Sequence, residues 1–172
     1  GHDTINIIVN HWPSKLGGEK RSMPYRNGAA ALSRHIADSI MHASKNAKVI
    51  IMGDLNDNPN AKSIMETLGT KTNTSGVGEY DLFNPMWQLY RDGIGSYAYR
   101  DSWELIDNII VSGGLVNPTP GTYKYMSVHI FKKGFMMTKT GSYMGYPFRT
   151  YAGGSYQGGY SDHLPVYIIL QK

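Results

Sequence analysis

The sequence predicts a layered domain of the α/β (α+β) class. Three observations support this: 172 residues suffice for one substantial core, 41% hydrophobic and 17% charged residues are typical of a globular chain, and helical and strand patterns are interspersed along the sequence. Two helices stand among the first strands, and mostly strands follow. Since no repeat or interdomain linker is visible, we expect residues 1–172 to form a single domain.

The first part of the chain contains two strands and two helices. Thr4–Asn10 is rich in Ile and Val and is typical of a strand. Apolar residues recur every three or four positions over about Tyr25–Lys45, which predicts one face of an amphipathic helix. Val49–Met52 is a short buried strand. Pro59 suits the start of a second helix, and Gly69 suits its C-terminal cap.

The rest of the chain is expected to be mostly strand. Helical spacing predicts one more helix, and runs of aliphatic residues predict strands around tight turns. Residues 134–160 are dense in Gly and Tyr without a sustained period, so they should be mostly loop with one irregular hairpin. The predicted elements are a helix at Tyr80–Asp92 and strands at Ser96–Arg100, Glu104–Ser112, Thr122–Phe131 and Leu164–Leu170.

Composition narrows the function classes. Cysteine is absent, which excludes disulfides, thiolate ligands and a cysteine nucleophile, so any metal must be held by oxygen or imidazole. No apolar run is long enough to cross a bilayer, so we do not expect an integral membrane protein. The net charge of +4 suits a phosphate-bearing partner. Localisation stays open, with a lean from the Cys, Tyr and Gly content towards an exported (periplasmic or extracellular) protein.

Polar side chains of catalytic type stand at the ends of four apolar strands, where a sheet can direct them into one cleft. Asp54 and Asn56 are two positions apart, so in an extended segment both point the same way. The alternative is an Asx-rich turn that caps the following helix. The candidates are His11, Asp54 with Asn56, Asp107, and Asp162 with His163.

Asp107 is costly to bury inside an Ile-rich strand unless a partner satisfies it. A histidine is the natural partner, and exposure on an edge strand is the alternative. Asp162 and His163 are adjacent and would point to opposite faces of a strand, so serving one site requires a loop, which the glycines before them favour. Asp162 then suits a hard cation, and His163 a phosphoryl oxygen.

In their order, these segments resemble the endonuclease/exonuclease/phosphatase superfamily of metal-dependent phosphoesterases, over essentially Thr4 to Leu170. The resemblance implies a DNase I-like four-layered sandwich of which this chain is the C-terminal half, with one mixed, mostly antiparallel sheet and helices on one face. The matching motifs are Ile8-Val9-Asn10-His11, Gly53-Asp54-Leu55-Asn56, Leu105-Ile106-Asp107 and Ser161-Asp162-His163-Leu164-Pro165-Val166.

The resemblance also implies roles for the candidates. Asp54 would activate or orient water, and Asn56 would hold the phosphoryl group. Asp162 would contribute to a Mg²⁺ or Mn²⁺ site. His163, oriented by Asp107, would stabilise charge on the phosphoryl oxygens, and whether Asp54 or His163 is the base stays open. His11, the last of the candidates, would contact the phosphate or the leaving group.

Family members carry an N-terminal half that supplies an Asn and the principal metal-binding Glu, and no segment before His11 provides them here. We therefore expect the fragment to be inactive or weak alone and the intact protein to be a metal-dependent hydrolase. Without a partner sheet, the chain would expose a broad apolar face. A homodimer or a retained N-terminal half should cover that face.

The expected substrate is a phosphodiester, in nucleic acid or in a phospholipid headgroup. The alternatives are a phosphomonoesterase of inositol-phosphatase type and a non-catalytic binding module that keeps the fold. Arg26 could instead form a structural salt bridge, and the Tyr side chains of the 134–160 loop could simply pack on the sheet. The candidates for substrate contact are Trp12, Ser14, Lys15 and Arg26 near His11, and Arg149 and Tyr151 with Tyr143, Tyr146, Phe148 and Tyr156 in the loop.

Overall fold

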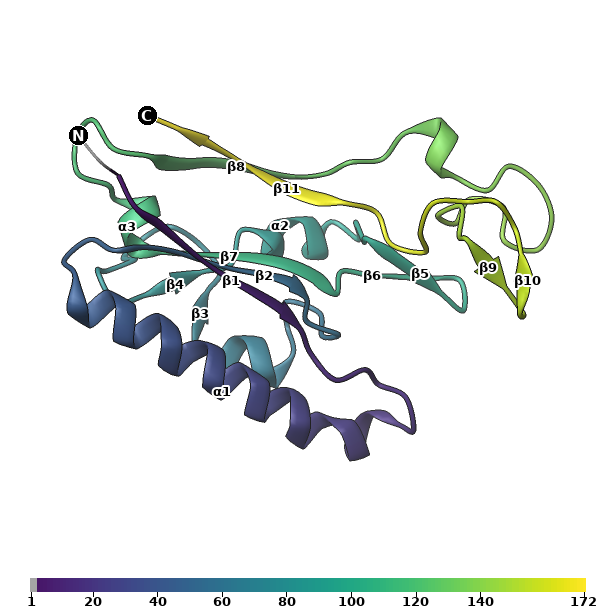
Figure 1. Cartoon of the computed structure of the whole chain (residues 1–172), viewed down its shortest axis with the longest axis horizontal. Coiled ribbons are helices and arrows are strands. Elements are labelled where there is room, and N and C mark those ends of the chain that lie inside the picture. The colour runs from purple at the N-terminus through teal and green to yellow at the C-terminus, as the bar shows by residue number, and fades with distance from the viewer. Residues whose placement is uncertain (1–2) are drawn as a thin grey trace.

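The computed structural model describes residues 3–172, so positions 1 and 2 of the predicted domain lie outside it. Strands and helices are interspersed along the chain (Figure 1). The elements are β1 (Ile5–His11), α1 (Glu19–Ala43), β2 (Lys48–Asp54), η1 (Ser63–Thr67), β3 (Thr70–Lys71), β4 (Leu82–Phe83), α2 (Met86–Arg91), β5 (Tyr97–Tyr99), β6 (Ser102–Glu104), β7 (Asp107–Ser112), α3 (Gly113–Val116), β8 (Lys124–Ile130), η2 (Gly134–Met136), β9 (Tyr151–Ala152), β10 (Ser155–Tyr156) and β11 (Val166–Gln171).

A five-stranded mixed sheet forms the centre, in the order β1-β2-β7-β4-β3. The β1–β2 and β3–β4 pairs are parallel, and β7 runs antiparallel to β2 and β4. The middle residues of β2 (49–52) and of β7 (109–111) are apolar because both faces of the sheet are covered there. This arrangement confirms the predicted mixed α/β fold.

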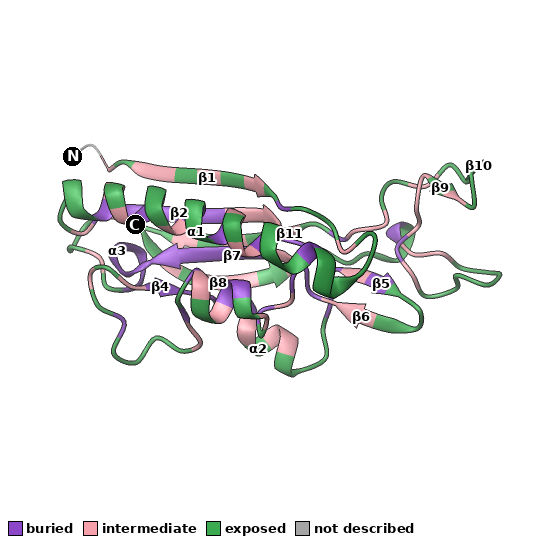
Figure 2. Ribbon diagram, turned by 90° about the horizontal axis from the view of Figure 1, so that it is seen from below, coloured by how far each residue is buried: buried purple, intermediate pink, exposed green. Residues whose placement is uncertain are grey.

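Two layers cover the two faces of this sheet (Figure 1). Helix α1 lies along one face, where Ala30, Ala37 and Met41 pack against Val49 and Ile51 of β2. The antiparallel pair β8–β11 lies on the other face, over a second apolar cluster. Figure 2 shows the buried positions concentrated in β2 and β7 and the outer side of α1 exposed. The chain thus covers part of the face that we expected to be open.

The first helix is longer than predicted. It begins at Glu19 rather than near Tyr25 and runs through Pro24. The side chain of Arg26, which is fully buried, pairs with Glu19, and the Ser22 hydroxyl donates to the Gly18 carbonyl at 2.9 Å. These contacts stabilise the additional turns, which the polar composition of the segment concealed.

The other two predicted helices are shorter than expected. Of the segment from Pro59, only Ser63–Thr67 is helical, although Gly69 does follow it at a φ of 72°. The prediction of a helix from Tyr80 is wrong at its start, because Leu82 and Phe83 form β4. Leu82 faces the α1 cluster and Phe83 faces the β8–β11 cluster, which is the two-residue alternation of a strand.

The 134–160 segment is mostly irregular, as predicted, with the short hairpin of β9 and β10 inside it. It lies at the end of the molecule where the β5–β6 hairpin is found (Figure 1). Within residues 3–172, no helix is long and apolar enough to cross a membrane.

Candidate active site

Three of the predicted residues stand in one row across the central sheet. His11 is paired in register with Asp54 of β2, and Asp54 is paired in register with Asp107 of β7. Side chains at paired positions point to the same face, here the face on which Ile50 and Ile109 pack beneath β8–β11. The His11 Nε2 atom lies 3.5 Å from Asp54 Oδ2. The three polar side chains therefore lie on the same face as this apolar cluster and form a polar site at the end of the strands.

His163 joins this row through Asp107. Its Nδ1 lies 2.8 Å from Asp107 Oδ2, and the Ser96 hydroxyl donates to the same oxygen at 2.5 Å. The predicted hydrogen bond between Asp107 and a histidine is present. Tyr97 forms an isolated antiparallel bridge with His163, and their rings lie 4.8 Å apart. These contacts fix the orientation of the imidazole.

Asn56 reaches the site through an Asx-type turn, which the sequence left open as the alternative, and not through an extended segment. The strand ends at Asp54, and Asn56 adopts a left-handed φ of 52° with its backbone N–H donating to Asp54 Oδ1 at 2.9 Å. Its side-chain amide donates to the Trp12 carbonyl at 2.8 Å. Directly before this turn, Gly53 permits the close approach of β1, since a Cβ there would lie 1.9 Å from the Asn10 carbonyl oxygen.

The environment shifts two pKa values in the site. Burial raises the pKa of Asp54, assisted by the nearby charge of Asp107 and opposed by the Asn56 backbone N–H and the two histidines. Burial alone would lower the pKa of His163, but the hydrogen bond and charge of Asp107, with the charges of Asp54 and Asp162, raise it above the ordinary value. Asp54 is thereby a stronger base than an exposed carboxylate, and His163 holds its positive charge to higher pH.

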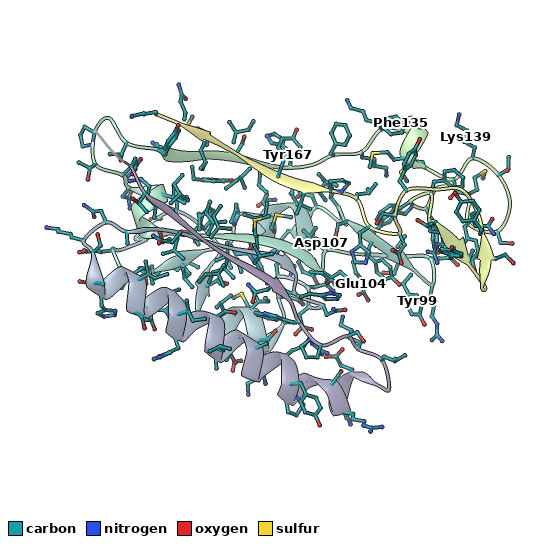
Figure 3. All side chains as sticks on the ribbon, in the orientation of Figure 1. Tyr99, Glu104, Asp107, Phe135, Lys139 and Tyr167 are labelled. Carbon is teal, nitrogen blue, oxygen red and sulfur yellow. The ribbon has the colours of Figure 1, made fainter. Side chains whose placement is uncertain are left out.

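These groups border a cleft of about 460 Å³. Figure 3 shows Asp107, Glu104 and Tyr99 following one another from the sheet towards the β5–β6 hairpin. The Lys15 amino group lies 3.4 Å from Glu104 Oε2, which tethers the loop after β1 to the cleft wall. The lining includes Ser14, Lys15, Asn56, Tyr97, Tyr99, Glu104, Asp162 and His163.

Two predicted substrate contacts are wrong. Trp12 is 3% exposed, packs in the α1 cluster and donates from its indole N–H to Asn10. Arg26 is fully buried, and its Nε lies 2.8 Å from Asp57 Oδ2. The structural salt bridge is therefore the correct alternative for Arg26. Burial removes both side chains from any substrate.

Of four further candidates for substrate contact, two line the cleft and two do not. Ser14 and Lys15 line the cleft. Arg149 lines a neighbouring cavity, and Tyr151 is 61% exposed on the β9–β10 hairpin, where it packs against Tyr156 and lines neither cavity.

Asp162 is the one predicted metal ligand. Among residues 3–172, no three His, Asp or Glu side chains are grouped to hold an ion. Asp162, Asn56 and Glu104 line the cleft with oxygen-bearing side chains, which suit Mg²⁺ or Mn²⁺ in type, but these side chains are fewer than the ligands that octahedral coordination requires. The donor set therefore fits a divalent ion only in part.

Comparison with known proteins identifies the family and the fold. A model of the Endonuclease/Exonuclease/phosphatase family matches residues 1–172. The chain belongs to this family. No curated protein matches the chain in sequence. The chain spans about half the length of the solved structures that it resembles, so this family member covers only part of their fold.

Three solved structures illustrate this similarity. A humanised D. rerio TDP2 is 15% identical with a TM-score of 0.53, over 96% of this chain and 54% of that one. Beta toxin from Staphylococcus aureus is 18% identical (TM-score 0.48, 95% and 51%). Sphingomyelinase C from Streptomyces griseocarneus is 13% identical (TM-score 0.40, 94% and 51%). The likeness to TDP2 shows the shared fold.

Sequence reasoning missed four residues of this endonuclease/exonuclease/phosphatase site. Ser96 and Tyr97 support Asp107 and His163, Glu104 lines the cleft, and Asn108 donates to the Asp57 carbonyl at 3.1 Å. The Asn108 amide holds the turn that carries Asn56. The sequence signal for Asn108 was a second buried polar residue inside the Ile-rich strand, directly after Asp107.

Proposed function

We propose that the intact protein is a metal-dependent phosphodiester hydrolase, with nucleic acid or a phospholipid headgroup as substrate. The observation that carries this proposal is the row of His11, Asp54 and Asp107, in register across three strands and joined to His163 by a hydrogen bond. A carboxylate with a raised pKa beside an imidazole with a raised pKa provides both a base and a positive charge.

In this proposal, Asp54 takes the proton of the attacking water. Its pKa is raised by burial, and it stays close to two imidazoles that stabilise its charge. His163 carries the positive charge that stabilises the phosphoryl oxygens, and Asp107 positions it. Asn56 lines the cleft and holds the phosphoryl group. His11 contacts the phosphate or the leaving group from the exposed end of the row.

Asp162, with Asn56, would hold Mg²⁺ or Mn²⁺, which would supply charge neutralisation at the phosphoryl group. Because the oxygen-bearing side chains of the cleft are too few for the ion, we propose that a further acidic ligand comes from an N-terminal half of the intact protein. Exported localisation is part of the same proposal and rests only on the composition.

The exposed edge of the central sheet supports the proposal that a partner half packs against it. Ile7 and Val9 of edge strand β1 are 56% and 76% exposed, on the face that β8–β11 covers further along the sheet. We propose that the N-terminal half covers them in the intact protein. In its absence, a second copy of the chain would cover them.

The test is hydrolysis by the intact protein of bis-p-nitrophenyl phosphate, a diester, compared with p-nitrophenyl phosphate, a monoester, with Mg²⁺ or Mn²⁺. We expect preference for the diester, and a loss of at least about a hundredfold in Asp54→Asn and His163→Ala. His129→Ala, on the outer surface of β8, is the matched control. Preference for the monoester would support the phosphatase alternative, and no turnover of either would support a binding module.

A further inference from the structure

A second cavity, of about 330 Å³, lies beside the cleft. It is formed between the turn of the β5–β6 hairpin and the 134–160 segment, and Tyr99 lines both hollows. We call it the tyrosine cavity, and its side chains relevant here are Tyr99, Arg100, Asp101, Tyr143, Tyr146 and Arg149. A substrate that fills the cleft can continue past Tyr99 into it.

Aromatic rings give this cavity surfaces for stacking. Tyr99 is 49% exposed and Tyr143 is 43% exposed, although both line a hollow. Tyr99 is nearly parallel to Tyr97 of the cleft, with 13° between the ring planes and 6.3 Å between centroids. The aromatic surface therefore runs from the His163 side of the cleft into the tyrosine cavity. Such a row accommodates consecutive flat groups.

Two guanidinium groups make the cavity positive. Arg149 lies over the Tyr143 ring at 4.9 Å, and Arg100 over the Tyr99 ring at 5.2 Å. The Asp101 carboxylate also lines the cavity and accepts from the Tyr146 hydroxyl at 2.7 Å, so the two guanidinium groups outnumber the one carboxylate. Within residues 3–172, the buried Nε of Arg149 has no hydrogen-bond partner. A buried donor of this kind is stabilised when an anion binds.

Arg149 also acts on the cleft. Burial raises the pKa of Tyr97, the charge of Asp162 adds to that rise, and the positive charge of Arg149 opposes it. Arg149 therefore lies close enough to influence both the cleft and the tyrosine cavity. An anion bound to Arg149 would therefore lie near the group in the cleft.

The charges select between the two substrate classes left open above. The choline end of a phosphocholine headgroup is cationic and would be repelled by the two guanidinium groups, whereas a nucleotide that adjoins the scissile phosphate offers a flat base and a second anionic phosphate. We infer that the tyrosine cavity binds the nucleotide adjoining the scissile phosphate of a single-stranded nucleic acid, with the base stacked on Tyr143 or Tyr99 and the next phosphate on Arg149. This inference rests on the proposed phosphodiesterase function.

The test measures binding of a fluorescein-labelled single-stranded oligodeoxyadenylate hexamer to the chain by fluorescence anisotropy, against a hexamer of abasic residues. We expect Tyr143→Ala to weaken binding of the base-bearing hexamer at least about fivefold and to leave the abasic hexamer unchanged. Arg149→Met should weaken both, while Arg149→Lys should recover part of the phosphate contact. Circular dichroism checks the folding of each variant.

Matched controls are Tyr123→Ala, an exposed tyrosine directly before β8, and Arg91→Met, at the end of α2. Both should bind like wild type. The inference is wrong if Tyr143→Ala matches Tyr123→Ala, if the abasic hexamer binds as well as the base-bearing one, or if the chain binds sphingomyelin vesicles through Tyr143 instead. Should Tyr143→Ala fail to fold, wild-type binding by Arg149→Met would overturn it equally.

Failure of this inference differs from failure of the proposed function. Bis-p-nitrophenyl phosphate has neither a base nor a second phosphate, so its hydrolysis does not need the tyrosine cavity. If the intact protein hydrolyses the diester but Tyr143→Ala does not change hexamer binding, nucleotide binding in the tyrosine cavity is rejected and the proposed function is not. Absence of hydrolysis would reject the function whatever the binding result.

Discussion

The hydrogen bond between Asp107 and His163 can be tested by one substitution. Its Nδ1 to Oδ2 distance is 2.8 Å, and the side chains are 16% and 26% exposed, so water screens the pair only in part. Burial opposes a charge on His163, but Asp107, with Asp54 and Asp162, outweighs it and raises the pKa of His163. Asp107→Asn keeps an oxygen acceptor and removes the charge, so the pKa of His163 should fall.

The effect on stability depends on pH. A histidine whose pKa is higher in the folded protein stabilises the fold fully below its unfolded pKa, about 6.5, and loses that contribution as pH rises through the folded pKa. Wild type should therefore exceed Asp107→Asn in free energy of unfolding by more at about pH 5.5 than at about pH 9. A hydrogen bond to a charged group contributes about 1.5–3 kcal/mol, and partial exposure favours the lower end, about 1.5 kcal/mol.

Urea unfolding followed by tryptophan fluorescence at both pH values measures this difference, and an NMR titration of the imidazole follows the pKa of His163. Asp92→Asn, at the exposed end of α2, is the matched control and should show no dependence of this kind. A difference between wild type and Asp107→Asn that is equal at the two pH values, or larger at the higher one, would refute the reasoning. So would an unchanged pKa of His163.

Three further predictions concern the frame of the site. Arg26→Met leaves Asp57 buried without its cation and should lower the free energy of unfolding by about 3–5 kcal/mol; a loss below about 1 kcal/mol in urea unfolding would contradict the buried pair. Gly53→Ala should cost at least about 2 kcal/mol because its φ is 133° and the Cβ meets the Asn10 carbonyl, whereas Gly28→Ala, with open space in α1, should stabilise by up to about 1 kcal/mol. Val9→Asp should convert any dimer of the chain to monomer in light scattering; a dimer that persists would place its interface elsewhere.

The sequence was sufficient to predict a contact of the site where the free-energy cost of burying a carboxylate favoured a partner. Asp107 in an Ile-rich strand required one, and His163 provides it. The sequence was insufficient where tertiary contacts decided. Arg26 carries a charge that favours solvent, yet it lies on the buried face of α1, where Asp57 from another segment pairs with it. Leu82 and Phe83 fit a helical period, yet the two opposite clusters of the core required a strand there.

The row of His11, Asp54 and Asp107 depends on ladder pairing between β1, β2 and β7, and His163 reaches it directly before β11 crosses the same face. All of these contacts lie within residues 3–172. The orientation of His163 is therefore fixed by this chain, whereas full coordination of a divalent ion needs more ligands than the oxygen-bearing side chains of the cleft bring. Experiments should therefore be able to distinguish the positioning of His163 from the binding of the metal ion. The pKa of His163 should already be raised in the chain alone, and adding the proposed N-terminal half should change hydrolysis far more than it changes that pKa.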